Sequence, residues 1–134
     1  MQTKLLLFII LIILNIIYDF CSSEKTGVCV ERKNKIFLLV LLHHFFCVFL
    51  YFGWIFNDKY VLMIYVATVF VTVSLWICTG TCYLTKMTNE ECGWDEHTKF
   101  NELLNCFNRY TKAQIKIHFP ILLIGSIIAV WKFI

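Results

Sequence analysis

The chain has 134 residues, of which 60% are hydrophobic and only 16% are charged, and its formal net charge is +3. An ordinary soluble domain has about 25% charged residues, and a small chain has a large surface for so few charges to cover. The composition therefore argues against a soluble globular domain, excludes intrinsic disorder, and gives no support for nucleic-acid binding. It indicates a protein whose surroundings are a lipid bilayer.

The first apolar run extends over the thirteen residues from Leu5 to Ile17 and directly follows Lys4. A basic residue before such a run is typical of a signal peptide, and thirteen residues are short for a membrane span. No clear small-x-small cleavage site follows the run. Two interpretations of residues 1–22 therefore stay open, a cleaved signal peptide and an uncleaved signal anchor.

Two longer apolar runs, without formal charge, predict helices near residues 36–56 and 60–84. A helix rises 1.5 Å per residue and the hydrocarbon core is about 30 Å thick, so about 20 residues suffice to cross it. The link between the runs is only Asn57-Asp58-Lys59. We therefore predict two transmembrane helices in a tight antiparallel hairpin.

The C-terminal part of the chain predicts two further helices. Residues 117–134 form a fourth apolar run, in which Lys132 can extend its ammonium group to the membrane interface. Before it, apolar side chains recur at i, i+3, i+4 and i+7 (Phe100, Leu103, Leu104 and Phe107). This period predicts an amphipathic helix near 98–110. It would lie in the interface or cap the bundle, or alternatively fill the groove of a specific partner.

Together these elements predict one membrane domain over residues 1–134. The fold class is all-α: an integral membrane, multi-pass helical bundle of three to four transmembrane helices with one amphipathic interfacial helix. Its partners would be the lipid bilayer and either a second copy of the chain or another membrane protein.

If all four runs span, the segments 19–35 and 85–116 lie on one side of the membrane, and the N-terminus, Lys59 and Lys132 lie on the other. The first side carries nine basic residues: Lys25, Arg32, Lys33, Lys35, Lys86, Lys99, Arg109, Lys112 and Lys116. The positive-inside rule would place that side in the cytosol. It also carries four cysteines that could form disulfides in an oxidising compartment: Cys21, Cys29, Cys92 and Cys106. The two signals conflict, and the cysteines favour the lumen.

Six histidines and cysteines fall at membrane depth or at its boundary: His43, His44, Cys47, Cys78, Cys82 and His118. Polar groups at this depth are candidates for function, and imidazole and thiolate are ligands that zinc or copper takes. Two pairs have the i, i+4 spacing of one helix face, but neither pair is a specific motif. Thiol–disulfide chemistry is a second interpretation, although enzymes of that kind usually use Cys-x-x-Cys. The third interpretation is structural, with histidines hydrogen-bonded between helices and cysteines packed as small apolar residues.

One stretch resembles a family of small multi-pass membrane proteins of unknown function. The resemblance covers residues 43–104 and rests on His44, on Trp76, and on the segment Cys82-Tyr83-Leu84-Thr85 with Asn89 after it. Gly53-Trp54 departs from the glycine pair of that family. The resemblance implies a cluster of Trp76, Cys82, Thr85 and Asn89 at the helix ends, and it implies no activity.

From these patterns we expect a non-enzymatic membrane component with a structural or accessory role. The alternative is a small redox or metal-binding membrane protein that uses the histidines and cysteines of one bilayer half. No sequence pattern identifies a cofactor or a catalytic residue.

Overall fold

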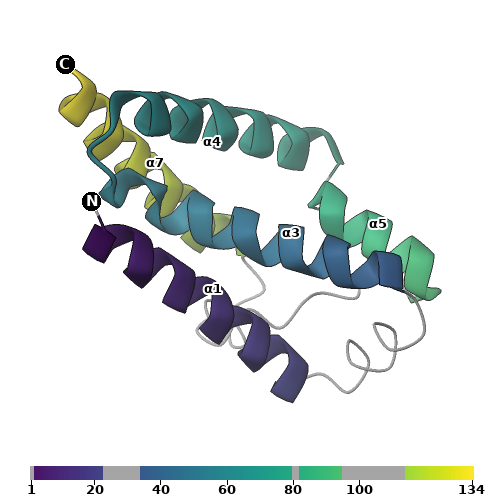
Figure 1. Ribbon diagram of the computed structural model, residues 1–134. Coiled ribbons are helices and arrows are strands. Elements are labelled where there is room, and N and C mark those ends of the chain that lie inside the picture. The colour runs from purple at the N-terminus through teal and green to yellow at the C-terminus, as the bar shows by residue number, and fades with distance from the viewer. Residues whose placement is uncertain (1, 23–33, 80–81, 95–113) are drawn as a thin grey trace.

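The computed structural model describes residues 2–22, 34–79, 82–94 and 114–134. All regular structure in these ranges is helical, so the predicted all-α class is confirmed. The elements are α1 (Gln2–Ser22), α3 (Asn34–Phe52), the short 3-10 helix η1 (Gly53–Ile55), α4 (Lys59–Thr79), α5 (Tyr83–Cys92) and α7 (Gln114–Phe133). Figure 1 shows them as a bundle of antiparallel helices with both termini at one end.

Three helices are long and apolar enough to cross a membrane, over Gln2–Cys21, Lys35–Ile55 and Lys59–Cys78. They belong to α1, α3 and α4. The apolar part of α7, His118–Phe133, is shorter; at 1.5 Å per residue it is about 24 Å long. These helices suit a multi-pass membrane protein.

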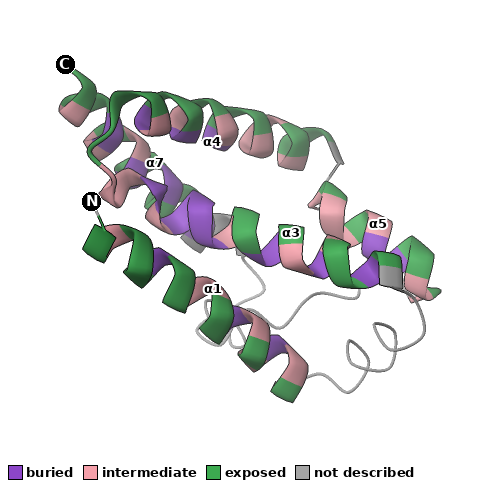
Figure 2. Cartoon of the chain, in the orientation of Figure 1, coloured by how far each residue is buried: buried purple, intermediate pink, exposed green. Residues whose placement is uncertain are grey.

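Helix α3 is the centre of the bundle. Half of the residues in its span are buried, against 17% in the spans of α1 and α4. Helix α1 packs along one side of α3, and α5 packs beside the N-terminal half of α3, beyond the end of α4 (Figure 1). Helix α7 packs mainly on α4. In Figure 2 the buried residues accordingly follow α3, while α1 and α4 are largely exposed.

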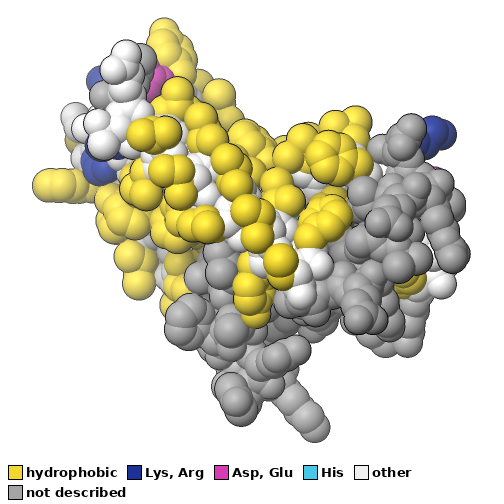
Figure 3. Space-filling view, turned by 60° about the horizontal axis from the view of Figure 1, so that its bottom comes forward, with side chains coloured by type: hydrophobic (Ala, Val, Ile, Leu, Met, Phe, Trp, Pro, Cys, Tyr) yellow, Lys and Arg dark blue, Asp and Glu magenta, His cyan; other side chains and the backbone are white. Residues whose placement is uncertain are grey.

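The core is aromatic and the exterior is apolar. Phe49 of α3 makes edge-to-face contacts with Phe8 of α1, at 6.3 Å between ring centroids, and with Tyr65 of α4, at 5.8 Å. Large hydrophobic side chains are also exposed along the outer faces, for example Leu6, Phe70 and Ile127. Figure 3 shows hydrophobic side chains over the described part of one face, with lysine and arginine only near its ends. Such an exterior fits hydrocarbon and would expose large apolar patches in water.

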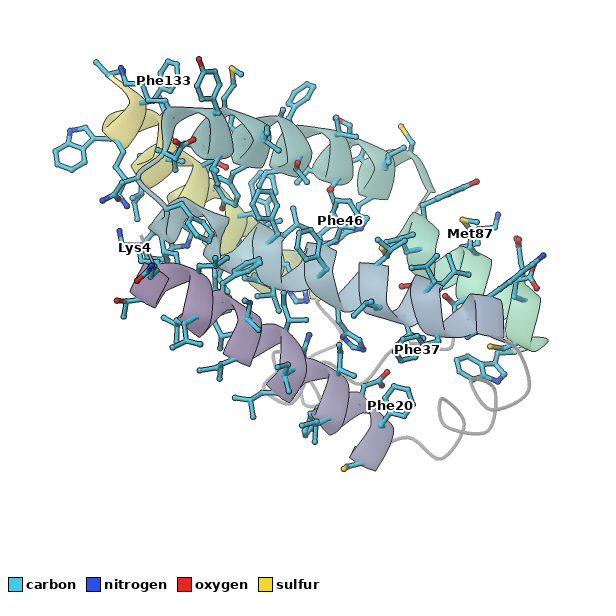
Figure 4. All side chains as sticks on the ribbon, viewed as in Figure 1. Lys4, Phe20, Phe37, Phe46, Met87 and Phe133 are labelled. Carbon is cyan, nitrogen blue, oxygen red and sulfur yellow. The ribbon has the colours of Figure 1, made fainter. Side chains whose placement is uncertain are left out.

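Lysines close the end of the bundle at which both termini lie. The ammonium of Lys4 donates to the carbonyl of Ile55 at 2.8 Å, and that of Lys132 donates to the carbonyl of Trp54 at 3.0 Å. In Figure 4, Lys4 and Phe133 mark this end and Met87 marks the opposite one. The N-terminus, the α3–α4 turn and the C-terminus thus share one side, as expected for antiparallel neighbours.

The α3–α4 turn is as short as predicted, but its helices end differently. Helix α3 stops at Phe52 and η1 continues to Ile55, so the predicted helix near 36–56 is present but is α-helical only as far as Phe52. Asp58 directly precedes α4 and caps its first turn. Its Oδ1 accepts hydrogen bonds from the backbone N–H groups of Tyr60 at 3.0 Å and Val61 at 3.1 Å. This is an N-cap, which satisfies amide groups that the first turn leaves without partners.

The predicted helix near 60–84 is wrong in its last part, because two helices replace one. Helix α4 ends at Thr79, Cys82 has extended backbone, and α5 begins at Tyr83. Glycine and threonine are poor helix formers, and the segment Thr79-Gly80-Thr81 supplies a physical reason for the break. The predicted amphipathic helix near 98–110 lies outside the described residues.

Helix α5 was not predicted, and a C-terminal cap stops it. Gly93 has a φ of 66°, in the left-handed region. The N–H of Gly93 donates to the backbone carbonyl of Glu90 at 3.3 Å, and the N–H of Trp94 donates to the backbone carbonyl of Asn89 at 2.9 Å. These are the two hydrogen bonds of a Schellman motif, in which glycine avoids the steric cost of a Cβ.

Gly125 lets α7 approach the rest of the bundle closely. A Cβ at this position would meet the Tyr65 hydroxyl and would lie 2.8 Å from Cδ1 of Trp54. Both neighbours are large rings held by their own hydrogen bonds, Tyr65 to the carbonyl of Leu50 and Trp54 to that of Tyr51. The glycine is therefore a packing requirement of the contact between α7, α4 and η1.

We expect Gly125→Leu to lower the free energy of unfolding by about 1–3 kcal/mol, because it overpacks this contact. The loss should appear although leucine favours a helix over glycine by about 1 kcal/mol. Unfolding in mixed detergent micelles, followed by circular dichroism, measures it. The control is Ile124→Leu, at a side chain that is 57% exposed. An increase in stability for Gly125→Leu would contradict the packing described here.

Candidate functional site

Helix α3 carries the polar side chains that meet in the interior. His43, Cys47 and Tyr51 follow one another at intervals of four residues, so they lie on one face of the helix. His44 is one residue further round and points to α1. His44, His43 and Tyr51 each contact a different neighbouring segment, and Cys47 contacts His43 within α3, so these polar groups form three clusters rather than one.

The first cluster joins α3 to α1 through His44. Its Nδ1 lies 3.1 Å from Nδ2 of Asn15 and its Nε2 lies 3.2 Å from Oδ2 of Asp19. The exposed fractions of the three residues are 5% for Asn15 and 0% for Asp19 and His44. Because an amide N–H can only donate and a carboxylate can only accept, this pattern fits an imidazole protonated on Nε2.

The second cluster is centred on His43, which is 2% exposed. Its Nε2 lies 3.5 Å from Sγ of Cys47 in the same helix, and its Nδ1 lies 3.9 Å from Sγ of Cys82. Cys82 immediately precedes α5, outside the three spans. The rings of His43 and His44 pack edge to face at 5.5 Å between centroids, so the first two clusters touch.

The local environment of Cys82 acts on its pKa in two opposite directions. Burial raises the pKa of the thiol, whereas the hydrogen bond and the charge interaction with His43 lower it, as do the backbone N–H groups of Thr85 and Leu84. The lowering contributions prevail, and the pKa is about 7. A thiolate beside an imidazole and at a helix N-terminus is a well-known way to increase cysteine reactivity.

The third cluster joins α3 to α7. The Tyr51 hydroxyl is hydrogen-bonded to Nδ1 of His118, and both residues are buried. Trp76 of α4 packs edge to face on the His118 ring, at 6.2 Å between centroids. His118 therefore interacts with a tyrosine of α3 and a tryptophan of α4.

The six predicted metal ligands are thus distributed over different places. His43, Cys47 and Cys82 meet, His44 and His118 belong to the other clusters, and Cys78 is exposed. The two thiols contact different nitrogens of His43, so one ion on either nitrogen would meet only one of them. Within the described ranges, no group of three or more His, Cys, Asp or Glu side chains is placed to hold a metal ion.

The predicted helix-end cluster is divided in a similar way. Cys82 and Thr85 lie together at the start of α5, where the Thr85 N–H contacts the thiol. Asn89 is buried, at 2% exposure, near the other end of α5. Trp76 packs on His118 instead.

The cysteines of the predicted disulfide set differ in state. Cys92 is in a disulfide, and its partner is not among the described residues. Cys21, at the end of α1, is an exposed free thiol. Cys29 and Cys106 lie outside the described residues.

Three further residues of these clusters, Asn15, Asp19 and Tyr51, were not among the predicted site residues. Asn15 and Asp19 are four residues apart, and they lie on one face of a helix that is otherwise almost entirely apolar. The i, i+4 spacing of these two polar residues could have indicated a helix face that packs inside the protein. It was overlooked because residues 1–22 were interpreted as a targeting segment.

Comparison with known proteins adds no relative. No family model matches the chain, and neither the curated proteins nor the solved structures provided a match. The resemblance described for residues 43–104 stays a prediction.

The contact between Asp19 and His44 can be tested with a double-mutant cycle. We expect a coupling free energy of about 1 kcal/mol between Asp19→Ala and His44→Ala, because either substitution removes the hydrogen bond between the two side chains. Unfolding in mixed micelles gives the four free energies. In the control cycle Ile17→Ala replaces Asp19→Ala, since Ile17 lies two residues away and is 52% exposed. Effects that add within about 0.5 kcal/mol in both cycles would contradict the contact.

Proposed function

We propose that the protein is a multi-pass component of a membrane, with a structural or accessory role. The observation that carries the proposal is that three histidines link α3 to three different segments. His44 contacts α1, His43 contacts Cys82 ahead of α5, and His118 of α7 contacts α3 through Tyr51. Buried imidazoles thus serve as connections between helices.

The physical reason lies in the solvent. In hydrocarbon, apolar packing alone distinguishes poorly between helix partners, because lipid tails are as apolar as leucine. Hydrogen bonds between polar side chains supply that specificity, and each unsatisfied group would be costly. Three polar clusters lie within a largely apolar core, and the outside is apolar as well, which supports a lipid environment.

The same contacts support a retained α1. Cleavage after residue 22 would remove Asn15 and Asp19, and it would leave His44 facing lipid without either partner. We therefore propose that residues 1–22 act as an uncleaved signal anchor and remain part of the bundle.

The disulfide at Cys92 supports one orientation. Disulfides persist in oxidising compartments and are rare in the cytosol, so the end of the bundle that carries α5 would face the lumen or the cell exterior. The opposite end, with Lys4, Lys59 and Lys132, would face the cytosol. This orientation follows the evidence of the cysteines and goes against the positive-inside rule, which would place the α5 side in the cytosol.

The structural role can be tested at His118. His118→Asn keeps an amide group near the position of Nδ1, so it should retain most of the stability, whereas His118→Leu should lower the free energy of unfolding by about 1 kcal/mol. The two variants are compared by unfolding in mixed micelles. Metal analysis and an absorption spectrum of the purified wild-type protein complete the test. Stoichiometric zinc, copper or haem that His118→Asn removes would refute a purely structural role.

The retention of α1 can be tested by intact mass spectrometry of protein purified from membranes. We expect a chain that still contains residues 2–22 and an N-terminal peptide with a reactive Cys21, which is exposed. Cys92 should react with a maleimide only after reduction. A mature chain that begins after residue 22 would contradict the proposed anchor.

A further inference from the structure

Cys82 lies where a thiol can meet a partner from outside the membrane. It is half-buried, it has extended backbone, and it sits at the N-cap of the ten-residue helix α5. The next residue, Tyr83, is 58% exposed. By contrast, Cys47, the other thiol near His43, lies in the middle of the α3 span.

The imidazole beside Cys82 is fixed in position. His43 is held at Nε2 by Cys47, at 3.5 Å, and on its ring by His44, at 5.5 Å between centroids. His44 is held in turn by Asn15 and Asp19. Nδ1 of His43 therefore points to Sγ of Cys82 from a preorganised ring, and the structural role proposed above does not require a thiol at that position.

We propose that Cys82 and His43 form a nucleophilic site for thiol–disulfide exchange, and that its substrate is a small or protein disulfide on the α5 side of the membrane. His43 is the proton acceptor, Cys82 is the nucleophile, and Cys47 is a positioning residue that acts through His43.

The reaction is balanced in atoms and electrons. The proton of the Cys82 thiol passes to Nδ1 of His43, and the thiolate attacks one sulfur of a disulfide R–S–S–R′. The Cys82–S–S–R bond forms, the S–S bond of the substrate breaks, and R′S⁻ leaves and takes the proton back. A second thiol, R″SH, then attacks the mixed disulfide and restores Cys82. The net reaction exchanges R′ for R″, and no additional oxidant is needed.

The substrate class follows from the helix that carries the site. Cys92, at the other end of α5, is in a disulfide, whereas Cys82 is a free thiol. A disulfide and a half-buried thiol beside a histidine thus coexist on one ten-residue helix. An environment that oxidises Cys92 to a disulfide also contains other disulfides, which are substrates for the Cys82 thiol.

The experiment uses full-length protein in nanodiscs, with iodoacetamide as a neutral thiol probe and glutathione disulfide as the substrate probe. Peptide mass spectrometry separates Cys82 from Cys78, an exposed thiol four residues earlier. We expect alkylation of Cys82 to be half-maximal near pH 7, below the value of an ordinary thiol, about 8.5. We also expect glutathione to be added to Cys82 faster than to Cys78.

The variant His43→Ala should move the half-maximal pH of Cys82 upward by about 1.5 units, from about 7 to the value of an ordinary thiol, about 8.5. At pH 7 the rate of glutathione addition to Cys82 should fall about threefold in this variant. The thiolate fraction falls about fifteenfold, but a more basic thiolate is a stronger nucleophile, which offsets part of the loss. Circular dichroism verifies that the variant is folded, and Cys78 is the internal control in the same sample. Cys82→Ser should abolish the adduct at this peptide.

Three results would overturn the proposal. The first is a pH profile of wild-type Cys82 that is half-maximal at or above the value of an ordinary thiol, about 8.5, a measurement that needs no variant. The second is addition of glutathione to Cys78 or Cys21 and not to Cys82. The third is a folded His43→Ala protein with an unchanged profile for Cys82.

Discussion

This bundle depends on one constraint: hydrocarbon offers no hydrogen bonds, so buried polar side chains must find their partners within the protein. A polar side chain in the core of a membrane has no water to bind, so it must find its partner on another helix or at the boundary. Helix α3 meets this condition three times, through His44, His43 and Tyr51, each toward a different segment. Its central position and its polar side chains are therefore two aspects of one arrangement.

The same constraint makes the clusters unequal. The Asn15–His44–Asp19 cluster is sealed, with 0% exposure at the histidine and the carboxylate, so it is suited to hold helices together. The His43 cluster opens at Cys82 toward the end of the bundle, so it is the one of the three described clusters that combines a fixed imidazole with a thiol that a solute can approach. A structural role and a reactive thiol thus coexist, because adjacent residues of α3 face different surroundings.

The amino-acid sequence predicted what composition and period determine. Long uncharged runs predicted α3 and α4, and the three-residue link predicted their antiparallel pairing. The break between α4 and α5 was missed, since the uncharged run continues to Leu84 although α4 ends at Thr79. The pairing of His44 with Asn15 and Asp19 was missed as well, because it depends on which face of α1 meets α3, and a single sequence does not fix the rotation of a nearly uniform apolar helix.

Lys132 has a consequence for the order in which the molecule is assembled. Its ammonium donates to the carbonyl of Trp54, 78 residues earlier in the chain, so η1 and α4 leave the ribosome before α7 does. The contacts of α7 with Trp54 and Tyr51 can therefore form only after the rest of the bundle has been synthesised. Helices α1, α3 and α4 enter the bilayer with an open flank, which α7 fills when it follows.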